Sequence, residues 1–226
     1  MPRRRVKERI YDQLARVGKA VASGRRMELL EILAQGERTV EKLAKETSLS
    51  IANTSHHLHV LRDACLVDAR KEGLYVYYRL ADPTVYELLR LMREIGERRL
   101  SELNGLVATY LTARDELEPV TREELLERAR AGTVLVIDVR PAEEYRAGHI
   151  RGAVSIPLSE LERSTRGIPA GKDIVAYCRG PYCVYAFRAV EILRLRGLRA
   201  RRLMEGFPEW RAAGMPVETS APEAAA

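Results

Sequence analysis

Apolar residues recur at helical spacing through the first half of the chain. In the first segment they stand at positions 6, 10, 14, 17 and 21, a period near 3.6 residues that is typical of one face of a helix. The pattern predicts five helices. Four of them cover residues 6–22, 25–35, 40–46 and 84–106, and the fourth in chain order begins after a serine at 48 or 50 and ends near residue 64. Thr39 is the expected N-cap of the third, and Ser48 or Ser50 of the fourth.

Strand-like alternation interrupts this helical half once. Residues 67–70 and 75–80 alternate between apolar and polar side chains, and Glu72-Gly73 between them is typical of a hairpin tip. Helix, short helix, turn, helix and hairpin in this order predict a mainly-α winged helix-turn-helix domain.

The second half has a different pattern, in which apolar runs alternate with helical segments. Residues 134–139 and 174–178 are predicted buried parallel strands, and 201–204 is a third. We therefore predict a multidomain chain, in which an α/β domain with a parallel sheet follows the first domain. The expected boundaries are 1–110 and 119–219, with a linker at 111–118 and a disordered tail at 220–226.

Composition limits the classes of protein that fit. The chain has 226 residues, a formal net charge of +6 and three cysteines. No run of about 18 apolar residues predicts a membrane span, and the charged N-terminus lacks the apolar core of a secretory signal. An odd number of cysteines without framework spacing favours a reducing compartment, so we expect a cytoplasmic protein. Residues 1–26 hold nine Arg or Lys; they either approach phosphates or form a solvated helix face.

The fourth predicted helix has one apolar and one polar face. Ile51, Thr54, Leu58 and Leu61 share the face that is expected in the core. The candidate DNA-binding residues lie on the other face, at the cap and on the hairpin: Ser50, Ala52, Asn53, Ser55, His56, His57, Arg70 and Lys71. Asn53 suits an adenine edge in the major groove, and the wing cations suit the phosphate backbone. A polar surface without any role in DNA binding is the alternative.

Two segments together resemble the ArsR family of dimeric bacterial repressors. They are Ser-His-His-Leu-His-Val-Leu at 55–61 and Gly-Leu-Tyr-Val-Tyr-Tyr at 73–78, and the resemblance covers about residues 20–100. It implies a homodimer, formed through the first and last helices, that binds palindromic operator DNA. His56, His57 and His59 also suit a metal. However, metal sensors of this family use cysteines in the segment equivalent to 39–47 or histidines in the last helix, and neither is present, so we expect no metal site and no cofactor.

The segment Tyr177-Cys178-Arg179-Gly180-Pro181-Tyr182-Cys183 holds the candidate chemistry of the second half. It lies where a predicted strand ends and a helical pattern over 184–196 begins. Unpaired N–H groups and the helix dipole favour a thiolate there, and the thiolate is the reactive form. A buried structural cysteine is the alternative interpretation.

Three segments in order resemble a single rhodanese domain, which carries a persulfide on its loop cysteine. They are 136–157 with Asp138, Arg140 and Glu143, the cysteine loop, and 205–217 with Gly206 and Trp210. The resemblance places the catalytic position at Cys178. It implies a small sulfur donor, such as thiosulfate, polysulfide or persulfide. The expected catalytic group is Cys178, Arg179 and Cys183, and the expected donor-binding residues are Gly180, Pro181, Tyr182, Val184 and Arg140.

The loop departs from the family pattern Cys-Arg-Ser-Gly-x-Arg-Ser in one important respect. Cys183 stands where that pattern has its second Arg, so one cation for an anionic donor is missing and a second thiol is present. This puts ordinary thiosulfate turnover in doubt and makes dithiol chemistry available. Cys183 is then either a resolving thiol or a small residue in the helix start.

These observations predict a transcriptional repressor whose second domain senses or carries sulfane sulfur on Cys178. The alternatives are a sulfurtransferase enzyme that uses the helix-turn-helix for dimerisation or localisation, and a repressor whose second domain binds a small anion without turnover. Two further side chains are expected to be structural: Cys65 as a small buried residue, and His149 at a turn before a strand.

Overall fold

The computed structural model describes residues 3–111, 119–164, 168 and 171–220. Most of the expected linker (112–118) and of the expected tail (221–226) lies outside the described residues. The chain divides into two compact units, Met1–Glu94 and Ile95–Ala226, which are described separately. The domain boundaries expected from the sequence stay predictions.

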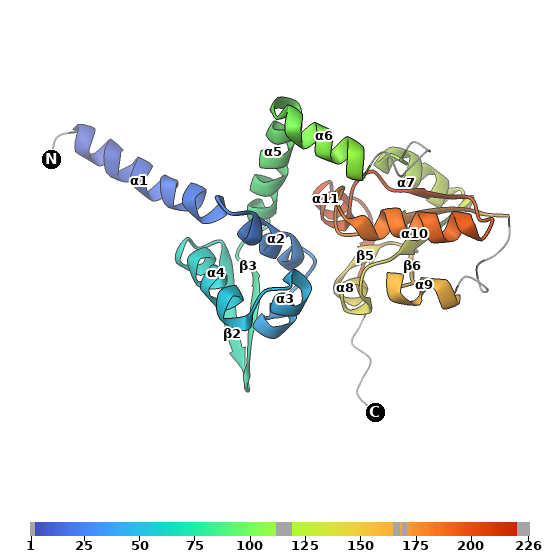
Figure 1. Cartoon of the computed structure of the whole chain (residues 1–226), viewed down its shortest axis with the longest axis horizontal. Coiled ribbons are helices and arrows are strands. Elements are labelled where there is room, and N and C mark those ends of the chain that lie inside the picture. Colours follow the sequence, from blue (N-terminus) through green and yellow to red (C-terminus); the bar gives the residue numbers. More distant parts are fainter. Residues whose placement is uncertain (1–2, 112–118, 165–167, 169–170, 221–226) are drawn as a thin grey trace. The chain divides into compact units, whose positions relative to one another are not determined.

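The first unit is a winged helix-turn-helix, as the sequence pattern predicts (Figure 1). Its elements are α1 (Arg3–Val21), α2 (Gly24–Leu33), β1 (Arg38–Thr39), α3 (Val40–Thr47), α4 (Ile51–Asp63), β2 (Val67–Glu72), β3 (Tyr75–Leu80) and the larger part of α5 (Thr84–Arg99). The strands form an antiparallel sheet in the order β1-β3-β2. The hairpin register runs from Val67 opposite Leu80 to Glu72 opposite Tyr75.

Side-chain caps position the turn between α3 and α4. The Thr39 hydroxyl accepts a hydrogen bond from the Lys42 amide, and the Ser50 hydroxyl accepts one from the Asn53 amide. Ser50 is therefore the cap of α4. Ser48 ends α3 instead, in the left-handed conformation with φ 54°. Each cap satisfies an amide that the helix itself leaves unpaired, and this fixes where α4 begins.

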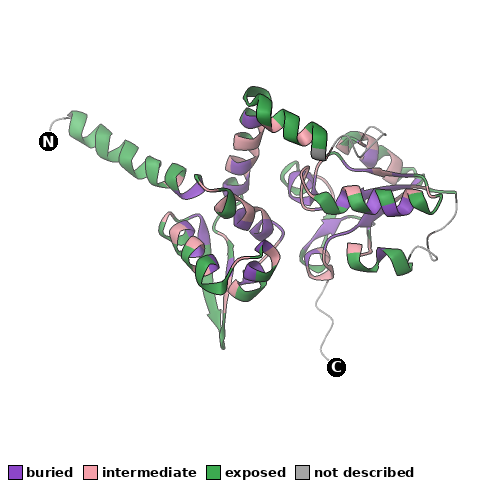
Figure 2. Cartoon of the chain, in the orientation of Figure 1, coloured by how far each residue is buried: buried purple, intermediate pink, exposed green. Residues whose placement is uncertain are grey.

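Leucines from three helices form the core of the first unit. Leu29, Leu30, Leu43, Leu58 and Leu61 are all fully buried. In contrast, α1 is exposed along most of its length (Figure 2). An amphipathic helix gains most of its stability when its apolar face packs against another surface, and most of the apolar face of α1 is exposed instead.

The predicted continuous helix over 84–106 is wrong. Helix α5 ends at Arg99, Leu100 is extended (φ −105°, ψ 99°), and a separate α6 runs over Ser101–Tyr110. The break allows Leu103 to fold back against Gly96, where a Cβ atom would lie only 3.0 Å from the Leu103 side chain. Apolar periodicity continues across the break and does not reveal it.

The second unit is built on a parallel sheet in the order β6-β4-β7-β8. Besides α6, its elements are α7 (Arg122–Arg130), β4 (Val134–Asp138), α8 (Ala142–Ala147), β5 (His149–Ile150), β6 (Val154–Ser155), α9 (Leu158–Ser164), β7 (Asp173–Tyr177), α10 (Val184–Leu195), β8 (Ala200–Arg202), α11 (Phe207–Ala212) and β9 (Val217–Glu218). The predicted parallel sheet is confirmed. Strand β6 and the small β5-β9 sheet are additional to the prediction.

Both faces of this sheet are covered. Helices α9 and α10 pack on one face, with Val190 and Leu193 buried against Ile174. Helices α7 and α11 pack on the other, where Phe207 and Trp210 are buried. The two central strands, β4 and β7, are apolar except for one aspartate each, and such apolar runs predict strands that are covered on both faces. Within the described residues, no helix is long and apolar enough to cross a bilayer.

Candidate functional site

The exposed face of α4 is the candidate nucleic-acid surface of the first unit. Ala52, Asn53 and His56 are exposed, while Leu58 on the opposite face is fully buried. Ile51 is 56% exposed, so its predicted place in the core is wrong. The reason is that the first three residues of α4 extend past the core and are exposed, and burial begins only at Thr54.

The other polar residues of this region differ in their burial and in the hydrogen bonds that their side chains already make. Ser50 uses its hydroxyl as the helix cap, and Ser55 is half-buried. His57 is half-buried too, and burial, with the positive charges of Arg26 and Arg25 nearby, lowers the pKa of its imidazole. Burial and these neighbouring charges therefore disfavour the protonated, charged form of His57.

The wing (β2 and β3) carries two paired arginines, Arg70 and Arg79, and one exposed lysine, Lys71. The Arg70 guanidinium bonds both Glu37, at 2.6 Å, and Glu72, and these carboxylates raise its pKa. Arg70 also stacks over the Tyr77 ring. Lys71 is exposed. A phosphate that contacts Arg70 must share it with two carboxylates, whereas Lys71 offers its charge directly.

The structure brings the two cysteines of the candidate loop together. Cys178 directly follows β7 and is 1% exposed, and Cys183 is the half-buried N-cap of α10. Their Cα atoms are 6.3 Å apart, and their sulfur atoms are joined as a disulfide. This separation lies within the span that a disulfide bridges. The third cysteine, Cys65, is free.

The backbone of the loop is held from the other side by the start of α11. The Phe207 amide donates to the Cys178 carbonyl at 3.0 Å, and the Cys183 amide donates to the Gly180 carbonyl at 3.1 Å. Gly206 lies so close that a Cβ atom there would overlap the backbone of Arg179 and Gly180. A glycine at position 206 is therefore required for this close approach.

Arg179 is paired with a buried acid. Its guanidinium makes a bidentate contact with Glu144, with distances of 3.0 and 3.1 Å from Nε, and Glu144 is fully buried. A buried carboxylate requires such a cation. Sequence reasoning named Glu143 and missed Glu144. The signal was present as an acidic pair at the start of α8, but only the fold shows which of the two faces inward.

Arg140 lies in a different place from the one expected. It is fully buried, bonds Asp138 at 2.6 Å and donates to the Gly148 carbonyl at 2.7 Å. The Tyr177 hydroxyl donates to the same Asp138, also at 2.6 Å. Arg140 therefore stabilises the interior beneath the loop and is not exposed to a sulfur donor. Burial, together with the negative charge of Asp138, raises the pKa of Tyr177 well above its ordinary value.

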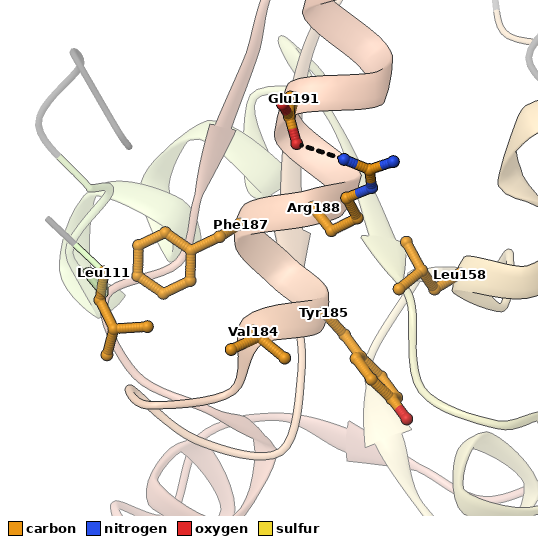
Figure 3. A pocket seen from close by; sticks show the side chains of 7 residues that line it. All are labelled: Leu111, Leu158, Val184, Tyr185, Phe187, Arg188 and Glu191. Carbon is orange, nitrogen blue, oxygen red and sulfur yellow. Dashed lines mark hydrogen bonds and ion pairs between the residues drawn. The ribbon is translucent and has the colours of Figure 1, made fainter. Parts of the chain in front are cut away.

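The remaining loop residues lie at the surface of the second unit. Gly180, Pro181 and Tyr182 are half-buried, and the Tyr182 hydroxyl donates to Glu97 at 2.7 Å. Val184 is 57% exposed. It lines a cavity of about 820 Å³ together with Tyr185, Phe187 and four other residues (Figure 3).

Two expectations about single side chains have different outcomes. Cys65 was expected to be buried, but it is exposed, with φ 59°. That left-handed conformation favours glycine, so a residue with a Cβ atom adopts it at some cost. His149 is the first residue of β5, is buried, and stacks on Tyr145 with ring centroids 3.7 Å apart; its structural role stays a prediction. Among the described residues, no three His, Cys, Asp or Glu side chains are grouped to hold a metal.

Two protein-family models match the chain. The model for bacterial regulatory proteins of the arsR family matches residues 23–69, and the model for the rhodanese-like domain matches residues 121–213. The two matches fall in the first and second unit, respectively.

Individual relatives match both units or one of them. The HTH-type transcriptional regulator Rv0324 of Mycobacterium tuberculosis is 45% identical over 216 residues, which cover 96% of this chain and 95% of the relative. The protein YqhL of Bacillus subtilis is 34% identical over 106 residues, or 46% of this chain and 81% of its own. A solved structure of a homodimeric winged helix-turn-helix DNA-binding domain from Mycobacterium bovis is 42% identical. It covers 44% of this chain and 90% of its own, with a TM-score of 0.40.

Proposed function

The chain belongs to the ArsR family of bacterial transcriptional regulators and carries a rhodanese-like domain; from this premise, we propose that sulfane sulfur, acting on the Cys178–Cys183 loop, controls its binding to operator DNA. The observation that supports the proposal most directly is the meeting of the two sulfur atoms between β7 and α10. A loop with two adjoining thiols has two stable states, and a regulator needs two states.

The reaction with a persulfide donor balances without another oxidant. The Cys178 thiolate attacks the outer sulfur of R–S–SH, which gives Cys178–S–SH and releases R–SH. The Cys183 thiolate then attacks the inner sulfur of Cys178, which forms the disulfide and releases H₂S. The sulfane sulfur is reduced by two electrons, and the two thiols are oxidised by two. Cys178 is the proposed acceptor and Cys183 the proposed resolving thiol.

Exposed apolar residues support the proposed homodimer. Val6, Ile10 and Leu14 are 45–61% exposed on α1, and Leu91 and Ile95 are 46% and 59% exposed on α5. Pairing with a second copy removes such stripes from water. A two-fold dimer then presents two α4 helices to half-sites about 34 Å apart. On this proposal, Asn53 and His56 contact base edges, and Lys71 contacts the backbone.

The chemistry of the loop argues against the alternative of a thiosulfate sulfurtransferase. Arg179 is paired with Glu144, Arg140 is fully buried, and Cys183 replaces the remaining loop cation. Inorganic anions bind through such cations. We therefore propose a sensor that undergoes one oxidation and reset per signal, in preference to an enzyme of high turnover.

The test is operator binding by the purified, reduced full-length protein with and without polysulfide, with an intact-mass measurement on the same samples. The parent is expected to lose two hydrogen atoms or gain sulfur, and to change its operator affinity. Cys178→Ser is expected to do neither, and Cys65→Ser is the matched control because Cys65 is exposed and free. Sulfur uptake by Cys178→Ser equal to that of the parent would contradict the assignment. Catalytic turnover of thiosulfate with unaltered DNA binding would support the enzyme instead.

A further inference from the structure

The two sulfur atoms of the disulfide are not equally accessible. Cys178 is 1% exposed and packs in the core between the sheet and α10, whereas Cys183 is half-buried at the start of the helix. A thiolate that reduces a disulfide attacks one sulfur and expels the other, and access decides which sulfur is attacked. In this form of the loop, Cys183 is the sulfur that a reductant reaches, and Cys178 is the leaving thiolate.

A cavity lies at the first turns of α10, the helix that Cys183 caps. Val184 and Tyr185, the two residues after Cys183, form part of its wall, and Leu158 faces them from the start of α9 (Figure 3). Its other lining residues are Leu111, Phe187, Arg188 and Glu191. Its volume of about 820 Å³ falls in the range of small-molecule sites.

The lining indicates the chemistry of the occupant. Five of the seven lining residues are aliphatic or aromatic, and the one cation and one anion, Arg188 and Glu191, bond each other at 2.9 Å. Arg179, the loop cation, lies 6.0 Å above the Tyr185 ring and is paired with Glu144. An inorganic anion gains little from such a wall, whereas an apolar organic group is removed from water there.

We propose that this cavity binds the apolar body of a small organic thiol, which resets the loop by attacking the sulfur of Cys183. The thiolate R–S⁻ forms R–S–S–Cys183 and expels Cys178 as a thiolate. A second R–SH then releases R–S–S–R and leaves Cys183 as a thiol. The two thiols are oxidised, the protein disulfide is reduced, and the charge balances. This inference rests on the proposed function, because a reset presupposes a loop that cycles between two states.

The experiment compares two probe thiols on the oxidised full-length protein: 2-phenylethanethiol and 2-mercaptoethanol at equal thiolate concentrations. The rate of disulfide reduction, followed by alkylation of quenched samples and intact mass, is expected to be about tenfold higher for the phenyl compound. Val184→Asp places a carboxylate in the wall and should bring this ratio close to one. Leu195→Asp, on the same helix, 81% exposed and outside the cavity, should leave the ratio unchanged. The new carboxylate repels both probe thiolates equally, so the ratio of the two reduction rates is unaffected by this repulsion.

Peptide mapping of the same quenched samples identifies the attacked sulfur. The mixed disulfide is expected on Cys183, with Cys178 alkylated. A mixed disulfide on Cys178, or an equal preference in parent and Val184→Asp, would overturn the proposal. Efficient reduction by a protein dithiol, with equal rates for the two small thiols, would overturn it as well. If the thiol preference holds while polysulfide leaves operator binding unaltered, the cavity stands and the proposed regulatory function fails.

Discussion

Replacing Arg140 by methionine tests whether this arginine stabilises the interior or binds a sulfur donor. Arg140 and Asp138 are both fully buried, and the guanidinium also bonds the Gly148 carbonyl. In the variant, Asp138 keeps the Tyr177 hydroxyl as a donor, but its negative charge has lost its cation. An unpaired charge in the interior is among the most destabilising changes that a single substitution makes.

The magnitude follows from the burial of both partners. Removing one partner of a buried pair costs about 3–5 kcal/mol, whereas a domain has a free energy of unfolding of about 5–15 kcal/mol. Arg140→Met should therefore remove a large part of the stability of the second unit. Asp138→Asn combined with Arg140→Met should recover part of the loss, because the charge itself is then absent.

The assay is urea unfolding of the full-length chain, followed by tryptophan fluorescence. Trp210 is the only tryptophan of the chain, and it is buried in the second unit, so the signal reports on that unit. Arg151→Met is the control: its pair with Glu218 is 65% and 46% exposed, and it should change the free energy of unfolding by less than about 1 kcal/mol. An Arg140→Met variant with the stability of the parent but without sulfur uptake would refute the structural role.

Three further predictions concern pH, DNA binding and packing. Raising the pH above about 10 should destabilise the second unit, because burial and the charge of Asp138 hold the pKa of folded Tyr177 well above that value while the unfolded chain loses its proton; an alkaline titration of tryptophan fluorescence with no transition would contradict this. Asn53→Ala and His56→Ala should each weaken specific operator binding by about 1–3 kcal/mol at unaltered thermal stability, since both side chains are exposed; binding titrations with specific and scrambled duplexes check this, and an unaltered preference counts against it. Leu58→Ala should lower the stability of the first unit by about 2–5 kcal/mol, as the side chain is fully buried; a melting curve like that of the parent would show that the core is elsewhere.

Local patterns were sufficient to predict most of the secondary structure. The buried face of α4, the Thr39 cap and the covered strand β7 each depend on residues close together in the sequence, which also narrowed the cap of α4 to Ser48 or Ser50. Such patterns carry their own physical cause, namely periodic burial or an unpaired amide that needs an acceptor. Ile51 shows the limit, because periodicity does not reveal where the core ends.

Features that depend on one specific tertiary contact are not encoded in apolar periodicity. The break at Leu100 lets Leu103 pack against Gly96, and the spacing of apolar residues is the same with or without that contact. The choice of Glu144 over Glu143 depends on Arg179, which lies 35 residues further along the chain. The sequence showed that a carboxylate was available, but only the fold decides which cation it meets.

The positions of the arginines support the proposal that the loop undergoes thiol chemistry in preference to anion binding. Arg179, which follows Cys178 in the chain, is paired with the buried Glu144, and Arg140 is paired with the buried Asp138. These pairs stabilise the backbone around the loop, but they leave those charges less available to an oxyanion, because each would have to give up a buried partner. With Cys183 in place of a third cation, the group nearest to Cys178 is a sulfur atom. The sulfur chemistry proposed for this loop therefore requires a partner thiol and an apolar wall beside it, and both lie at the start of α10.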